Sequence, residues 1–334
     1  MFISLSLNPC IDLNMEVDAF SFDQPLRALS ERKRAGGKGM NIAIILGILG
    51  MEATAVAVVA GHSGAEFCDL AGEAMEPLPV RLEAVYVPGE TRTNTVLTAC
   101  GSAQHLKVNQ RGQALSALGL QRVFTSLDGL VNRGDILILS GSLPPGALGA
   151  TYAVLGKRYA KRGCRIVLDA DGEALKGGLL VRPYLVKPNR DELAVFAGRP
   201  LETEQDIIAA ARKMLDAGAE MCLVSDGPRP AFLITNEFVL RGIPPEASGS
   251  PSGAGDAMLA GFLAAGAGWD KADIATGIEI QLLEQKNEGV FVKEADRLSA
   301  CFRLALACGS AAASMPDTMY CAWDDVKKKL SAGK

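Results

Sequence analysis

Residues 249–261 read Gly-Ser-Pro-Ser-Gly-Ala-Gly-Asp-Ala-Met-Leu-Ala-Gly, a turn of small residues followed by an apolar run. The pattern predicts that Gly253, Ala254 and Gly255 open a buried helix, because glycine permits the tight turn and the next residues are mostly apolar. The first amides of a helix lack intrahelical partners and carry the positive end of its dipole, so they can bind an anion. Asp256 falls in the first turn of this helix. A carboxylate there could be only a helix cap, so its meaning depends on the rest of the chain.

Composition limits the classes of protein that this chain can form. The 334 residues are 49% hydrophobic and carry a formal net charge of −4. A chain of this length can bury the core of one large α/β domain. Its basic residues are dispersed, which argues against nucleic acid as a partner, and no apolar run is long enough for a membrane. The N-terminus lacks the features of a signal peptide, so we expect a cytoplasmic protein.

The cysteines and histidines exclude several kinds of chemistry. The eight cysteines include no Cys-x-x-Cys pair, and a chain this large needs no disulfides, so we expect them to be reduced. Only His62 and His105 are present, which makes a Ser-His-Asp hydrolase or a histidine-rich metal site hard to build. Catalysis would therefore depend on carboxylates, lysine, arginine and backbone amides.

A second glycine-rich loop lies at residues 35–41, Ala-Gly-Gly-Lys-Gly-Met-Asn, and precedes an apolar helix predicted over residues 40–49. Its glycines would let the backbone approach a ligand, and Lys38 would supply positive charge. It is not a Walker loop, because Gly39 follows Lys38 where Ser or Thr is required. By itself the loop could equally be a turn with a solvated lysine.

Short apolar strands alternate with helices along most of the chain, which is typical of a parallel sheet with helices on both faces. Strands are expected at residues 2–7, 54–60, 135–139, 165–169, 184–187 and 221–225, and helices at about 148–162, 297–315 and 323–330. Polar residues follow the strand ends, where ligands bind in such sheets. Residues 13–34 and 85–108 fit short strands better, and we assign them to a small outer sheet from which Arg92 projects. No repeat or linker divides the chain, so residues 1–334 should form one domain.

Taken together, these motifs resemble those of the ribokinase-like (PfkB) family of carbohydrate kinases, and more narrowly its sugar-phosphate branch of 1-phosphofructokinases and tagatose-6-phosphate kinases. The matching stretches run in the family's order at residues 8–12, 35–41, 91–94, 140–146, 168–175, 186–193 and 253–256. The resemblance implies an α/β fold of three layers (α/β/α) with a mainly parallel central sheet. It also implies a small β-sheet lid that often forms a homodimer interface.

The resemblance further implies transfer of the γ-phosphoryl of ATP to a hydroxyl of a sugar phosphate, with Mg²⁺. Asp256 corresponds to the catalytic base, and the anion hole corresponds to Gly253, Ala254 and Gly255. The positions that hold the sugar phosphate correspond to Asp12, Gly37, Lys38, Asn41, Arg92 and Ser140. The nucleotide-binding positions correspond to Lys187, Asn189, Ser225 and Gly227. The Mg²⁺ region corresponds to Asn189 and Glu192, which we expect to act through water.

Phosphoryl transfer requires positioning and charge neutralisation more than covalent chemistry, so these residue types suit it. Lys38 and Arg92 would give two cations for a phosphate that the sugar already carries. The lid would keep water away from the γ-phosphoryl.

Three features depart from the family pattern. Pro230 stands where relatives commonly carry a glycine of the nucleotide loop, Ser252 stands where Val or Thr is expected, and the polar segment 281–294 near the expected adenine site is longer than usual. These differences predict an altered nucleotide affinity or preference.

The leading hypothesis is a 1-phosphofructokinase, which makes fructose 1,6-bisphosphate from fructose 1-phosphate and ATP. Tagatose-6-phosphate kinase and 6-phosphofructokinase are close alternatives, because Lys38 and Arg92 suit either substrate. A sugar-phosphate sensor without turnover belongs to another class, and the intact Asp256 argues against it. A nicotinamide-dependent oxidoreductase would need a glycine-rich turn directly after the first strand, where residues 8–10 read Asn-Pro-Cys.

Overall fold

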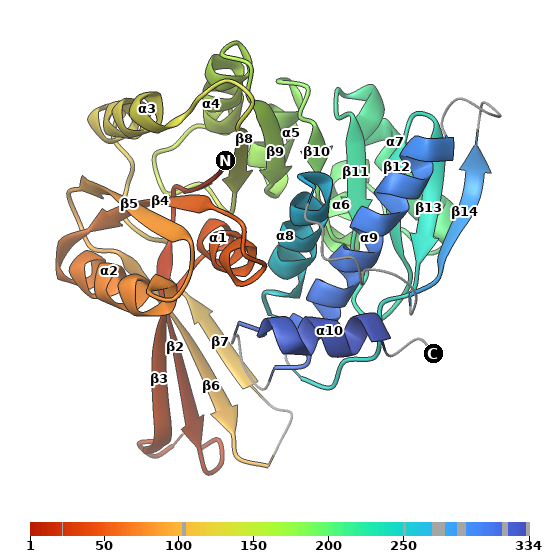
Figure 1. Ribbon diagram of the computed structural model, residues 1–334. Helices are drawn as coiled ribbons and strands as arrows, with labels where there is room; N and C mark the ends of the chain where they lie inside the picture. The colour runs from red at the N-terminus through yellow and green to blue at the C-terminus, as the bar shows by residue number, and fades with distance from the viewer. Residues whose placement is uncertain are drawn as a thin grey trace.

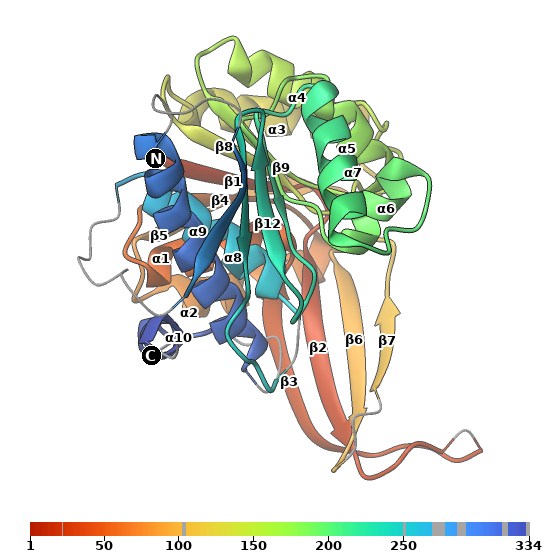
Figure 2. The same ribbon diagram turned by 90° about the vertical axis from the view of Figure 1, so that its right-hand side faces the viewer.

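The computed structural model describes residues 1–21, 23–101, 105–249, 252–268, 278–285, 292–315 and 320–331. A ten-stranded sheet lies between two layers of helices, and a separate four-stranded sheet projects from this body (Figures 1 and 2). The order in the large sheet is β14 (Ile280–Gln285), β13 (Phe238–Gly242), β12 (Ala231–Thr235), β11 (Met221–Val224), β10 (Leu185–Val186), β9 (Arg165–Asp169), β8 (Ile136–Ser140), β1 (Phe2–Ser6), β4 (Ala53–Ala60) and β5 (Val80–Val87).

From β11 to β5 the strands of this sheet are parallel to their neighbours. Strands β1, β4 and β8 are buried along their whole length, which explains why they are continuous apolar runs and do not alternate. The predicted mainly parallel sheet is confirmed. We did not predict the antiparallel edge formed by β12, β13 and β14. Residues 281–285 of the polar segment belong to β14, whereas residues 286–291 lie outside the described residues.

The two faces of the large sheet carry separate helical layers, which Figure 2 shows on opposite sides of the strands. One apolar core joins the sheet to α1 (Lys38–Ile48), α2 (Gly61–Met75), α8 (Ala254–Gly266), α9 (Val292–Ala313) and α10 (Trp323–Ser331). The other core joins it to α3 (Ala117–Leu130), α4 (Thr151–Ala160), α5 (Gly172–Leu179), α6 (Arg190–Ala197) and α7 (Glu204–Asp216). Within the described residues, no helix is long and apolar enough to cross a membrane. All eight cysteines are free.

The small sheet has the strand order β3 (Ala28–Gly36), β2 (Cys10–Val17), β6 (Arg92–Ala99) and β7 (His105–Asn109). One part of our assignment was wrong: residues 85–87 belong to β5, which pairs with β4 in the large sheet. The alternating pattern of this segment reflects an edge strand with one exposed side, and sequence alone does not tell which sheet such a strand joins.

Helix α8 is held in place by close packing against α9. A Cβ atom on Gly261 would lie 2.8 Å from both the Leu304 carbonyl oxygen and the Cys308 Sγ, so only glycine permits this approach of the two helices. Residues 256–264 of α8 are buried. The start of α8, with Asp256, is therefore fixed by the core.

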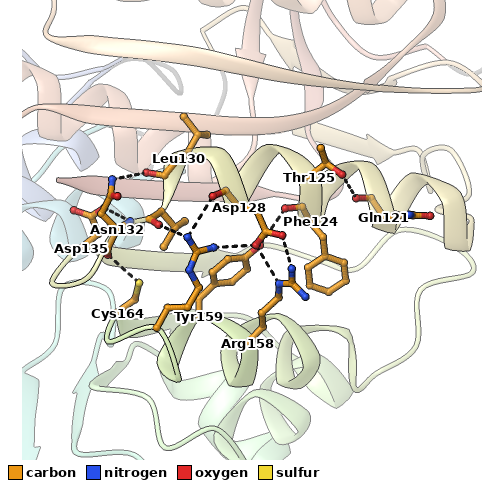
Figure 3. Close-up of polar contacts among 12 residues, drawn as sticks. Gln121, Phe124, Thr125, Asp128, Leu130, Asn132, Asp135, Arg158, Tyr159 and Cys164 are labelled. Atoms are coloured by element: carbon orange, nitrogen blue, oxygen red, sulfur yellow. Dashed lines mark hydrogen bonds and ion pairs between the residues drawn. The ribbon is translucent and has the colours of Figure 1, made fainter.

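A polar cluster joins α3 to α4 on the opposite helical layer (Figure 3). Asp128 accepts hydrogen bonds from Arg158, from Arg162 at 2.9 Å and from the Tyr159 hydroxyl at 3.1 Å. None of these four residues lines the cavity described below. Their contacts are fully accounted for by the packing of the two helices.

Candidate active site

A cavity of about 820 Å³ lies at the carboxyl ends of the parallel strands, and residues of both sheets line it. All of the site residues that the sequence predicted are among its lining: Asp12, Gly37, Lys38, Asn41, Arg92, Ser140, Lys187, Asn189, Glu192, Ser225, Gly227, Gly253, Ala254, Gly255 and Asp256. The fold therefore brings together residues that are far apart in the sequence.

The start of α8 has the geometry of an anion site. Gly253 is the residue before the helix, and its φ of 81° lies in the left-handed region that glycine adopts without strain. Glycine has no side chain that could cap the helix, so the first amides of α8 have no side-chain acceptor from this position. A Cβ on Gly255 would lie 3.2 Å from Lys187 Nζ, which places a cation beside these amides.

Asp256 is 6% exposed, and its Oδ2 accepts a hydrogen bond of 2.7 Å from Asn41 Nδ2. Burial raises the pKa of Asp256 to about 6, with a further contribution from the charge of Asp169. Lys38, Asn41 and Lys187 oppose this shift. A carboxylate with a pKa near neutrality is well suited to accept a proton.

A second buried carboxylate, Asp169, forms ion pairs with two lysines. Its Oδ1 lies 2.9 Å from Lys38 Nζ and 3.4 Å from Lys187 Nζ, and its side chain is 0% exposed. Burial alone would raise the pKa of Asp169, but Lys187 and Lys38 lower it. Lys38 also contacts Glu192 Oε1 at 3.2 Å. Burial opposes its charge, yet Asp169, Glu192 and Asp256 together raise the pKa of Lys38.

The sequence placed Asp169 at a strand end but gave it no role. The signal was present, because it ends β9 at the edge where ligands bind. Its two lysine partners come from α1 and from the end of β10, and no local pattern links them.

Asn189 and Glu192 form the capping box of α6. The Glu192 amide donates to Asn189 Oδ1 at 2.8 Å, and the Asn189 amide donates to Glu192 Oε2 at 2.9 Å. Within the described part of the chain, no group of three or more His, Cys, Asp or Glu residues could hold a metal ion. Ser225 pairs with Asn189 as a parallel bridge, and Gly227 follows it with a φ of 60°.

Ser140 and the residues at the start of α1 line the cavity beside the end of β1. The Ser140 hydroxyl donates to the Leu5 carbonyl at 3.4 Å. A Cβ on Gly39 would lie 2.6 Å from Ser6 Oγ and 2.8 Å from Ser140 Oγ, so this position requires glycine. Gly37, with a φ of 117°, turns the chain into α1.

Each strand of the small sheet contributes a polar side chain to one cross-strand row, and β6 also contributes Arg92. Arg34 is paired with Asp12, Asp12 with Asn94, and Asn94 with Asn109, so these side chains lie on one face. All four line the cavity. Sequence reasoning assigned only Asp12; the other three required the strand register, which the sequence does not fix.

Arg92 is the first residue of β6, and its guanidinium donates hydrogen bonds to two backbone carbonyls from separate loops. Its Nε donates to the Asn8 carbonyl at 3.2 Å, and its Nη1 donates to the Gln110 carbonyl at 3.1 Å. Of the positions that depart from the family pattern, Ser252 lines the cavity and Pro230 does not.

Uncapped amides at a helix start, an adjacent carboxylate of raised pKa and nearby lysines are the groups that phosphoryl transfer to a hydroxyl requires. The fold and the cavity thus define a site suited to a phosphotransferase. Residues 5–325 match the family model described as "pfkB family carbohydrate kinase". The chain therefore belongs to the PfkB family of carbohydrate kinases, which confirms the resemblance and makes it a sugar kinase with ATP as substrate.

Individual relatives agree with this assignment. A 1-phosphofructokinase of Xanthomonas campestris pv. campestris is 34% identical, over 79% of this chain and 83% of that protein. A 1-phosphofructokinase of Rhodobacter capsulatus is 35% identical, over 81% of this chain and 86% of that protein. The structure of phosphofructokinase-2 from Escherichia coli in complex with substrates and products has a TM-score of 0.84 at 26% identity, and 99% of each chain is covered.

Asn41→Ala is expected to raise the pKa of Asp256 above its value of about 6, because the substitution removes a hydrogen bond that stabilises the ionised carboxylate. A ¹³C NMR titration of the aspartate carboxyls, with Asp256→Asn to assign the resonance, measures this pKa directly. Asn132→Ala is the control, because Asn132 donates to a backbone carbonyl outside the cavity. An unchanged or lower pKa in Asn41→Ala would contradict the contact.

Proposed function

We propose that this protein is a 1-phosphofructokinase, which transfers the γ-phosphoryl of ATP to fructose 1-phosphate and forms fructose 1,6-bisphosphate and ADP. The proposal rests on one observation: the N-terminus of α8, Asp256 and cationic residues of the small sheet all line one cavity. The relatives named 1-phosphofructokinase support the choice of substrate.

In this proposal Asp256 accepts the proton of the attacking sugar hydroxyl. The amides of Gly253, Ala254 and Gly255 stabilise the charge on the transferred phosphoryl through fixed dipoles, which need no reorganisation during the reaction. Because Asp256 has a pKa of about 6, it is mostly ionised at neutral pH and becomes protonated below that value. Turnover should therefore fall as the pH is lowered through about 6.

The contacts of Lys38 refine its proposed role. Its ammonium already pairs with Asp169 and Glu192, and Asp256 contributes to its raised pKa. We therefore assign Lys38, with Lys187, to the side of the transferred phosphoryl. The phosphate that the sugar already carries is then assigned to Arg92 on the small sheet, which we propose acts as a lid.

We further propose that Mg²⁺ accompanies ATP and is held through water by Asn189 and Glu192. A carboxylate oxygen accepts more than one hydrogen bond, so Glu192 can keep its contacts with Lys38 and the Asn189 amide while accepting from a metal-bound water. Nucleotide contacts are proposed for Lys187, Asn189, Ser225 and Gly227. The ion would neutralise part of the charge of the nucleotide phosphates.

The substrate is tested by ADP release with fructose 1-phosphate, fructose 6-phosphate and tagatose 6-phosphate. We expect fructose 1-phosphate to give the highest kcat/KM, and Asp256→Asn to lower turnover at least about 100-fold while ligands still bind. Comparable low rates on all three sugars would refute the specific claim. Binding of a sugar phosphate without any turnover at saturating MgATP would favour a sensor. Unchanged turnover in EDTA would exclude the role of Mg²⁺.

Arg92→Ala is expected to raise the KM for the sugar phosphate much more than the KM for ATP, because it removes a cation assigned to the sugar's phosphate. Steady-state kinetics with each substrate varied in turn measures both constants. Arg122→Ala is the matched control: Arg122 also donates to a backbone carbonyl, that of Tyr86, but lies outside the cavity. Equal changes in both KM values would contradict the assignment.

The small sheet also suggests a homodimer. Its second face, opposite Asp12, carries a cross-strand row of Met15, Leu97 and Leu106 beside Val108, which is 52% exposed. We propose that a second copy of the chain covers this face. Sedimentation equilibrium should then give the mass of two chains, and Leu106→Lys should shift the mass to one chain. A monomer at micromolar concentration in the unmodified protein would exclude the dimer.

A further inference from the structure

The segment that contains Tyr320 returns to the base of the small sheet, 285 residues away in sequence from its contact there. The ring of Tyr320 stacks on the guanidinium of Arg34, with 5.1 Å between Arg34 Cζ and the ring centroid. Its hydroxyl donates to the Ala35 carbonyl at 3.1 Å. The next residue, Cys321, is fully buried, and α10 follows. Tyr320 thus precedes a segment anchored on the body of the protein and contacts two residues of β3, Arg34 and Ala35.

Arg34 connects Tyr320 to Asp12, which lines the cavity. Its Nη2 lies 3.0 Å from Asp12 Oδ2, and its side chain is only 14% exposed. Its Nε is buried without a hydrogen-bond partner within the described residues. The guanidinium is therefore held by two contacts, the Tyr320 ring on its face and the Asp12 carboxylate at its edge.

Asp12 is oriented from three sides. Besides Arg34, Cys10 Sγ donates to its Oδ1 at 3.2 Å, and Asn94 Nδ2 lies 3.4 Å from the same oxygen. A Cβ on Gly36 would lie 2.2 Å from Asp12 Oδ2, so the carboxylate occupies space that only glycine leaves free. Such convergence fixes one rotamer of a side chain that lines the cavity.

We propose that Tyr320 is a positioning residue of the sugar subsite, which acts through Arg34 on the carboxylate of Asp12. This inference rests on the proposed function, in which Asp12 binds the sugar. It makes the packing of the C-terminal segment a determinant of sugar affinity, although Tyr320 is absent from the cavity lining.

The physical reason is the conformational freedom of arginine. A free guanidinium on a long side chain loses rotamer entropy when it is fixed, and an aromatic ring on its face offsets that loss through a cation–π contact. Without the ring, Arg34 can leave Asp12, whose carboxylate then keeps only the long contacts of Cys10 and Asn94 to Oδ1, so the ligand must complete its orientation. The free energy needed to orient Asp12 then weakens the binding of the sugar. The nucleotide residues Lys187 and Asn189 lie on other elements and should not be affected.

The test compares Tyr320→Leu with Tyr184→Leu. Tyr184 stacks on Arg165 at 5.0 Å, so its loss removes the same kind of contact away from the cavity. Tyr320→Leu is expected to raise the KM for the sugar phosphate roughly 5- to 20-fold, a size between those of an exposed and a fully desolvated cation–π contact, with the KM for ATP unchanged. Tyr320→Phe keeps the ring and should recover most of the affinity. Tyr184→Leu should change neither constant.

The route through Arg34 is tested by a double-mutant cycle with Arg34→Met. If Tyr320 acts through Arg34, Tyr320→Leu adds nothing in the Arg34→Met background. Additive effects, or equal changes in both KM values, would overturn the inference. Should Tyr320→Leu fail to fold, Arg34→Met alone must still raise the KM for the sugar phosphate without raising the KM for ATP. If it does not, the inference is likewise overturned.

The outcomes for this inference differ from those for the proposed function. An unmodified protein that phosphorylates no sugar phosphate would refute the function itself. An active unmodified protein in which Tyr320→Leu behaves like Tyr184→Leu would refute only the role of Tyr320.

Discussion

The site depends on the neutralisation of one buried carboxylate by two lysines. Asp169 has no exposed surface, and a buried charge without a partner would cost several kcal/mol, so Lys38 and Lys187 are required for this fold as well as for the chemistry that we propose. These three residues join α1, β9 and the end of β10. The same ion pairs leave cations beside the start of α8, where a phosphoryl group would carry negative charge. In the proposed reaction, the structural and functional requirements for these lysines therefore coincide.

Asp256 shows the complementary effect of burial. Its carboxylate has a hydrogen-bond donor in Asn41 but no lysine within salt-bridge distance among the described residues, and its pKa is accordingly raised to about 6. Two buried aspartates of one site, Asp256 in the cavity lining and Asp169 paired with the cavity residues Lys38 and Lys187, thus have pKa values shifted in opposite directions. The difference comes from their partners, because both are buried: Asp169 pairs directly with two cations, whereas Asp256 receives an amide. Such separation is typical of sites that assign different roles to similar groups.

Close approach of the backbone is the second constraint. Gly36 leaves room for the Asp12 carboxylate, Gly39 for two serine hydroxyls, and Gly261 for the packing of α8 on α9. Each of these glycines fixes a contact between elements that are distant in sequence. The small sheet gains its cavity face in the same way, because strand pairing aligns Arg34, Asp12 and Asn94 in one row. The Tyr320 contact extends this row into the C-terminal part of the chain.

The sequence by itself determined the alternation of strands and helices, the two glycine-rich loops that open α1 and α8, and the placement of polar residues at strand ends. These features are local, since they follow from short-range periodicity and from the backbone freedom of glycine. The tertiary structure alone decided that β5 joins the large sheet, that three antiparallel strands extend one edge, and that Asp169 meets Lys38 and Lys187 while Tyr320 meets Arg34. Each of those outcomes depends on strand register or on side chains that meet from distant elements, and no short stretch of sequence contains that information.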